Sequence, residues 1–199
     1  QGAVGEILLK SNDQNVELRL PAEQLLEPEP IVVHPGLELH YKLARYFARK
    51  RLEWKAERAE PLSEINLSLS TRARSPAGAG LGGSSTLSIA MIGALATWAK
   101  GEAVDPEREG ETFIEITRDV ETTVIKVPAG LQDYYGAMYG GLQSIRWLPG
   151  SHDRRWLPPA IALGLEKRLL LFYSGQSRNS GINNWALFKG LIDRQADVQ

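Results

Sequence analysis

The chain has 199 residues, 43% of them hydrophobic, with 23 basic and 24 acidic side chains and no cysteine. This length predicts one domain, or one and part of another, and the near-neutral charge gives no electrostatic footprint for nucleic acid or an anionic membrane. The lack of cysteine excludes disulfides, thiolate catalysis and cysteine-ligated zinc, and it fits a reducing cytoplasm.

The first third of the chain predicts a hairpin, a helix and a strand. Two apolar runs flank the turn-rich pentapeptide SNDQN, which is typical of a β-hairpin, and a proline-bearing loop follows at 21–30. Apolar residues recur at helical spacing from Gly36 to about Lys50, which predicts an amphipathic helix. Three apolar residues then alternate with polar ones, as in a half-buried strand: Ile65, Leu67 and Leu69.

Two helices are predicted next, separated by a short break. The segment from about Ser84 is apolar nearly all round, which indicates a buried helix, and Gly101 ends it. Asp105 and Pro106 supply an N-cap and a first-turn proline for a second helix that runs to about Thr123.

The last part of the chain mixes helix and strand without any internal repeat. A loop and a short helix lead to a Gly-Gly break and a strand at 142–147, and a turn-rich connection, LPGSHDRRWLPP, follows. The apolar run KRLLLFYSG predicts a buried strand, and a helix starts at Gly181. We expect a domain boundary in the connection at 157–166, which gives domains of 1–160 and 161–199.

Membrane and histidine-rich metal proteins do not fit this sequence. No apolar run reaches the ~18 residues of a spanning helix, and the first residues lack the charged-then-apolar pattern of a signal peptide. The three histidines are scattered along the chain: His34, His40 and His152. Because the chain opens with Gln1 and ends in an uncapped helical segment, we expect it to be a piece of a longer protein.

The glycine-rich stretch from Gly78 to Ser85 is the strongest functional signal. It follows a predicted strand and opens a helix, so its backbone amides and the helix dipole favour a bound phosphate. The two serines could cap the helix, touch phosphate or ligate Mg²⁺. A plain loop-to-helix turn needs fewer glycines than this stretch has.

Two common phosphate-binding loops do not fit. The spacing of Gly78, Gly80 and Gly83 satisfies G-x-G-x-x-G, but the segment before Glu102 and Asp105 is a single helix and leaves no room for the second strand of a dinucleotide fold. A Walker loop needs a lysine after its glycines, and none stands there.

Two segments resemble the GHMP kinases, the superfamily of galactokinase, homoserine kinase, mevalonate kinase and phosphomevalonate kinase. SPAGAGLGGSST resembles its second signature, and VPAGLQDYYGAMYGGLQSI resembles its catalytic-aspartate segment in the form of the heptose-phosphate kinase and fucokinase branch. The resemblance covers about 64–147, and more loosely 167–178. It implies a two-domain α+β fold, with a ribosomal protein S5 domain 2-like N-terminal domain and the start of a ferredoxin-like C-terminal domain.

The resemblance also implies roles for single residues. Asp133 falls on the base toward the acceptor hydroxyl, Glu121 on the glutamate that holds Mg²⁺, and Ser84 on the serine that shares this metal. The residues that would bind ATP are Pro76, Gly78, Ala79, Gly80, Leu81, Gly82, Gly83, Ser84 and Ser85. Candidate substrate contacts are Gln132, Tyr135 and Arg178.

Simpler interpretations remain open for several of these residues. Glu121 could be a solvated residue of a last helical turn, and Asp133 could be the N-cap of the helix that begins near Tyr134. The neighbouring tyrosines could stack on a sugar or serve only in packing. Arg178 could bind a sugar phosphate or lie on the surface.

Other family features are not found in this sequence. The first signature should precede residue 1, and the third should follow Gln199. Asp133 is followed by Tyr-Tyr, where the sugar-kinase branch has Gln and an aromatic residue, so the acceptor stays open.

We therefore predict an ATP- and Mg²⁺-dependent kinase that phosphorylates a hydroxyl of a sugar or sugar phosphate. The alternatives are a GHMP kinase for mevalonate or homoserine, and a non-catalytic member that binds a sugar or nucleotide. The expected partner is a small molecule, with no nucleic acid or membrane, and a homodimer is compatible with the sequence.

Overall fold

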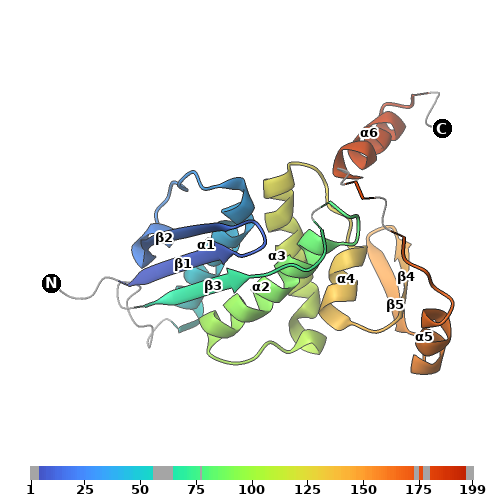
Figure 1. Cartoon of the computed structure of the whole chain (residues 1–199), viewed down its shortest axis with the longest axis horizontal. Helices are drawn as coiled ribbons and strands as arrows, with labels where there is room; N and C mark the ends of the chain where they lie inside the picture. Colours follow the sequence, from blue (N-terminus) through green and yellow to red (C-terminus); the bar gives the residue numbers. More distant parts are fainter. Residues whose placement is uncertain (1–4, 56–64, 77, 173–174, 177–179, 196–199) are drawn as a thin grey trace.

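The structure is a computed structural model of mixed helices and strands (Figure 1), and it describes residues 5–55, 65–76, 78–172, 175–176 and 180–195, with the backbone alone for 180–184. Its strands are β1 (Glu6–Ser11), β2 (Val16–Pro21), β3 (Leu67–Thr71), β4 (Gln143–Leu148) and β5 (Ser151–Trp156). Its helices are the 3₁₀ turn η1 (Ala22–Leu25), α1 (Pro35–Lys55), α2 (Gly83–Lys100), α3 (Pro106–Ile125), α4 (Gln132–Tyr139), α5 (Pro159–Glu166) and α6 (Ser180–Ile192).

The N-terminal sheet has the strand order β2-β1-β3. The predicted hairpin is confirmed, since β1 pairs antiparallel with β2, and β3 pairs parallel with the other edge of β1. Ile7 and Leu9 of β1 are fully buried, and Leu9 lies opposite Leu69 of β3. Because alternate strand residues point to the same face, these side chains form one apolar face of the sheet.

The predicted helices form as expected, and they cover the sheet. Helices α1 and α2 supply most of the buried residues that pack with the sheet, and Phe113 of α3 joins them. Gly101, with φ 83°, ends α2, and the Asp105 side chain accepts from the Glu107 amide as the N-cap of α3. Helix α1 extends to Lys55, one turn beyond the prediction, with Arg51 buried in its last turns.

Helix α4 is held by a smaller buried cluster, which places the candidate site. Tyr134 and Tyr135 pack with Ile89 of α2 and Ile114 of α3. Helix α4 therefore lies beside α2 and α3 (Figure 1).

The turn-rich connection predicted after β4 is wrong in part, because 151–156 forms strand β5. This strand pairs antiparallel with β4, from Gln143 opposite Trp156 to Leu148 opposite Ser151. Gly150, with φ 72°, supplies the left-handed residue of the tight turn between them. The sequence SHDRRW lacks apolar alternation, so its pattern did not indicate a strand.

The buried strand predicted at 167–175 is wrong for the residues described. Leu170, Leu171 and Phe172 are 80%, 80% and 85% exposed and do not belong to a strand. Within the described ranges, the sheets consist of β1–β3 and β4–β5, so this run has no neighbouring strand with which to exchange hydrogen bonds. The helix predicted after it is confirmed as α6.

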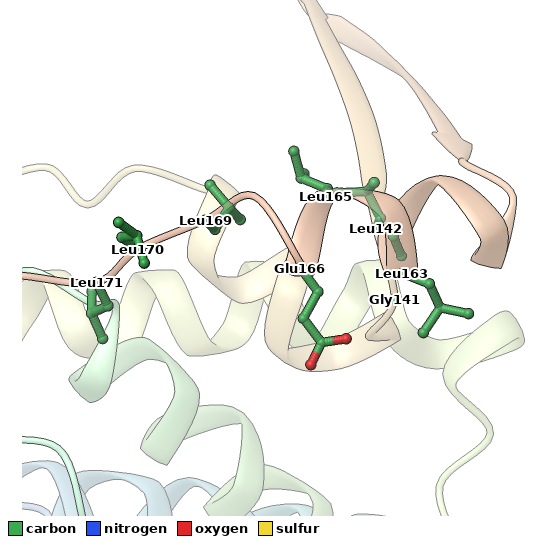
Figure 2. Close-up of a pocket in the computed structure, with 9 residues that line it drawn as sticks. Gly141, Leu142, Leu163, Leu165, Glu166, Leu169, Leu170 and Leu171 are labelled. Atoms are coloured by element: carbon green, nitrogen blue, oxygen red, sulfur yellow. The ribbon is translucent and has the colours of Figure 1, made fainter.

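An open apolar hollow of about 660 Å³ lies at this end of the chain (Figure 2). Its lining comes from the two residues before β4, from α5 and from the run after α5: Gly141, Leu142, Ala162, Leu163, Leu165, Glu166, Leu169, Leu170 and Leu171. None of these is a predicted site residue. Among the described residues, no helix is both long and apolar enough to cross a membrane.

Candidate functional site

The glycine loop connects β3 to α2 and has the backbone geometry of an anion-binding loop. Gly78, Gly80 and Gly82 have φ of 70°, 72° and 65°, a left-handed conformation that side chains rarely tolerate. Gly82 is the N-cap of α2, so the first amides of this helix lack a side-chain capping oxygen. Free amides and the positive end of the helix dipole favour an anion here.

The other predicted loop residues shape this connection. The Pro76 carbonyl accepts a hydrogen bond from the Ala79 amide at 3.3 Å, at the start of the glycine loop. Leu81 is 55% exposed, and Ser84 lies exposed in the first turn of α2. Ser85 is buried and bonds to the Tyr134 hydroxyl.

Asp133 lies directly against the glycine loop. A Cβ added to Gly82 would lie 2.7 Å from Asp133 Cγ and 2.9 Å from its Oδ2. The carboxylate therefore contacts the start of α2, where a phosphate would bind. The N-cap of α4 is Leu131 and Asp133 is inside the first turn, so the N-cap interpretation of Asp133 is wrong.

Glu121 is a buried residue of the last turns of α3, only 3% exposed, so its interpretation as a solvated residue is wrong. Its Oε2 accepts a 2.7 Å hydrogen bond from the Tyr134 hydroxyl and lies 3.5 Å from Ser88 Oγ. Ser88 Oγ in turn donates to the Ser84 carbonyl at 2.8 Å. One short chain of polar groups thus connects Glu121 to the first turn of α2.

Tyr134 fixes the position of the Glu121 carboxylate. Burial, together with the hydrogen bond to Glu121, raises the pKa of Tyr134 far above its ordinary value. The phenol therefore stays protonated at neutral pH and donates a hydrogen bond to the Glu121 carboxylate. From the sequence we expect only packing or sugar stacking for Tyr134, because spacing alone does not show which of two consecutive tyrosines faces Glu121.

The donor chemistry of this region fits Mg²⁺. Among the described residues, neither Glu121 nor Asp133 forms an ion pair with a lysine, arginine or histidine, so the site has negative charge that no described cationic side chain balances. Carboxylate and hydroxyl oxygens are the ligands that Mg²⁺ prefers. The described part of the chain has no group of three or more His, Asp or Glu residues for a metal, so phosphate and water would have to complete the shell.

The three candidate substrate contacts differ in their placement. Gln132 is exposed at the start of α4, next to Asp133. Tyr135 is 3% exposed, its ring contacts Trp147 and His152, and its hydroxyl donates to Glu111. These contacts place Tyr135 against the β4–β5 hairpin and support its packing interpretation. Arg178 lies outside the described residues.

The comparisons with known proteins identify the family of the chain. The chain belongs to the GHMP kinases, since the model for the GHMP kinases N terminal domain matches residues 38–141. The resemblance on which the sequence prediction rests is thus confirmed, as is the mixed α and β fold with this N-terminal domain. A curated relative, the D-glycero-alpha-D-manno-heptose 7-phosphate kinase of Campylobacter jejuni, is 29% identical over 121 residues, covering 58% of this chain and 34% of the relative.

Three solved structures share the fold. A candidate sugar kinase from Campylobacter jejuni has a TM-score of 0.65 at 18% identity, over 98% of this chain and 58% of its own. A D-glycero-D-manno-heptose 1-phosphate kinase from Bacteroides thetaiotaomicron has 0.54 at 20% identity, over 77% and 44%. The mevalonate kinase of Methanococcus jannaschii has 0.51 at 19% identity, over 79% and 44%. The chain spans about a third of the curated relative's length and less than two thirds of these structures.

Proposed function

We propose that the protein transfers the γ-phosphoryl group of ATP to a hydroxyl of a sugar or sugar phosphate, with Mg²⁺ bound at the glycine loop. The observation that carries this proposal is the contact between Gly82 and Asp133. It puts a carboxylate beside a helix N-terminus whose N-cap residue, Gly82, supplies no side-chain capping oxygen. Phosphoryl transfer needs these two elements together, because catalysis rests on positioning and on charge stabilisation.

Each residue of the site has a part in this proposal. The amides of the glycine loop and of the first turn of α2 hold the phosphates of ATP. Asp133 accepts a hydrogen bond from the acceptor hydroxyl and takes or orients its proton as the oxygen attacks the γ-phosphorus and the bond to the leaving ADP oxygen breaks. Glu121 and Ser84 would hold Mg²⁺, which neutralises charge on the phosphates when bound.

The nature of the acceptor follows from the relatives by analogy. The curated relative is named as a heptose 7-phosphate kinase, and we extend this class of acceptor to the present chain. We also propose that the boundary near residue 160 separates an ATP-binding domain from a second domain, and that the reaction takes place in the cytoplasm.

Coupled ADP release by the full-length protein tests this function. The acceptors are heptose 7-phosphate, fucose, galactose, mevalonate and homoserine, each with and without Mg²⁺. Turnover on a sugar that needs Mg²⁺ supports the proposal. Turnover on mevalonate or homoserine alone would replace the sugar by another acceptor. ADP binding without turnover on any acceptor would favour a non-catalytic binding protein.

A further inference from the structure

The end of β3, from which the glycine loop departs, is held by the turn of the β1–β2 hairpin. Asn12 donates from its side-chain amide to Ser70 Oγ at 2.8 Å and to the Thr71 carbonyl at 2.9 Å. The Asn12 backbone amide donates to the same carbonyl at 2.9 Å. Asp13 Oδ1 accepts from the Ala73 amide at 3.2 Å, two residues beyond the strand. The turn thus binds the backbone of 71–73 by three hydrogen bonds.

His40 of α1 also contacts Thr71, the last residue of β3. It is 2% exposed, and its Nε2 lies 2.7 Å from Thr71 Oγ1. Because Thr71 Oγ1 donates its own proton to the Lys10 carbonyl at 3.4 Å, it accepts from His40 Nε2–H. No described residue forms a hydrogen bond with the buried His40 Nδ1, as fits the ring nitrogen that has no proton.

The path from this point to α2 is short and closely packed. A Cβ added to Gly83 would lie 3.2 Å from Ser75 Oγ, so Ser75 lies against the start of α2. Next along the chain, the Pro76 carbonyl accepts from the Ala79 amide. The glycine loop is therefore fixed at one end by α2 and at the other by the contacts to residues 70–73. Fixing both ends of a loop lowers the conformational entropy that a ligand must remove on binding.

We propose that Asn12, Asp13 and His40 form an exit clamp that pre-organises the glycine loop for nucleotide phosphates. This inference rests on the proposed function. The three are positioning residues, because they act on the loop through residues 70–73. Asp13 has the most testable role, since it is exposed on a hairpin turn. Its Oδ1 also accepts from the hydroxyl of the buried Ser11 at 3.3 Å, and Asp13→Asn keeps an oxygen for both bonds.

The test uses the full-length protein and three variants. Asp13→Ala removes the acceptor of the Ala73 amide, Asp13→Asn keeps an oxygen in this position, and Glu17→Ala is the matched control. Glu17 lies in the same hairpin and pairs on the surface with Lys10 and Arg19, away from the glycine loop. The measurements are the Kd for ADP with Mg²⁺, by calorimetry, and the hydrogen exchange rates of the amides of 78–85 without nucleotide.

The clamp predicts a specific pattern across these variants. Asp13→Ala raises the ADP Kd by about five- to tenfold, less than the full contribution of a hydrogen bond to a charged group because Asp13 acts on the loop indirectly, and speeds exchange at 78–85. Asp13→Asn restores most of both properties, and Glu17→Ala changes neither. His40→Phe, which removes the donor to Thr71, acts in the same direction as Asp13→Ala.

Exchange at 78–85 that Asp13→Ala leaves unchanged would overturn the clamp. Equal ADP Kd values for Asp13→Ala and Glu17→Ala would also overturn it, because the hairpin would then serve stability alone. If the wild-type protein bound no ADP, the proposed function would fail. The exchange rates would still decide whether the clamp holds the loop.

Discussion

Replacing Gly82 with alanine perturbs the contact on which the proposed site depends. Gly82 has φ of 65°, and an added Cβ would lie within 3.0 Å of three Asp133 atoms, Cγ, Cβ and Oδ2. Real Cβ atoms essentially never approach other atoms so closely, so the glycine loop and the Asp133 carboxylate must separate. The substitution therefore moves the proposed base away from the phosphate site without removing any functional group.

The expected size of this effect has two parts. The left-handed conformation costs a residue with a Cβ about 1–2 kcal/mol, so the free energy of unfolding should fall by about this amount. A displacement of about 1 Å in a reacting group can lower the rate about 100-fold. We therefore expect kcat for Gly82→Ala to fall about 100-fold, far more than the loss of stability explains.

Coupled ADP release and urea unfolding of the full-length protein measure these two quantities. Gly93→Ala is the matched control, because Gly93 lies within α2 and a Cβ there meets no atom within 4 Å. Alanine in a helix interior raises stability by up to about 1 kcal/mol, and kcat should not change. A Gly82→Ala protein with kcat within about threefold of wild type would refute the proposed contact between loop and base.

Three further predictions concern the groups around the site. Tyr134→Phe removes the donor to the buried Glu121 carboxylate, so the free energy of unfolding should fall by about 1–3 kcal/mol. Urea unfolding measures this value, and an unchanged value would argue against the hydrogen bond. Glu121→Gln should raise the Mg²⁺ concentration that gives half-maximal ADP release; an unchanged Mg²⁺ dependence would remove Glu121 from the metal site. Burial lowers the pKa of His40 below 6.5, partly opposed by Asp13. Because the folded-state pKa is the lower one, the stability that His40 contributes is present above about pH 6.5 and is lost as the pH falls through the folded-state pKa. Unfolding free energies measured between pH 7 and pH 5 should then fall more for wild type than for His40→Gln, and parallel curves would contradict this.

Local patterns in the sequence predicted most of the N-terminal fold. The hairpin and the helices that became α1, α2 and α3 follow from short-range periodicity and from capping residues such as Asp105 and Gly101. Whether a segment forms a strand depends on hydrogen-bond partners outside the segment itself, which explains both errors. Ser151–Trp156 pairs although it lacks apolar alternation, and 167–172 does not pair although it is apolar.

The candidate site was predictable only in part. Motif resemblance gave the loop, Asp133 and Glu121, but no local pattern places Asp133 against Gly82, because these residues meet only when α4 packs on α2. Successive residues of a helix point about 100° apart, so Tyr134 reaches Glu121 while Tyr135 turns to the β4–β5 hairpin. Which of the two tyrosines reaches Glu121 depends on the residue at which α4 begins and on the elements packed against it, and local sequence patterns do not determine either.

The central claim is that Asp133 acts on the acceptor hydroxyl beside bound ATP. The most direct measurement is kcat for ADP release by full-length Asp133→Asn on its best acceptor, together with the ADP Kd of the same variant. The claim predicts that kcat falls by about 10²- to 10⁴-fold while the ADP Kd stays close to that of wild type. Turnover that the variant retains at the wild-type rate would contradict it, as would a loss of activity explained entirely by weaker ADP binding.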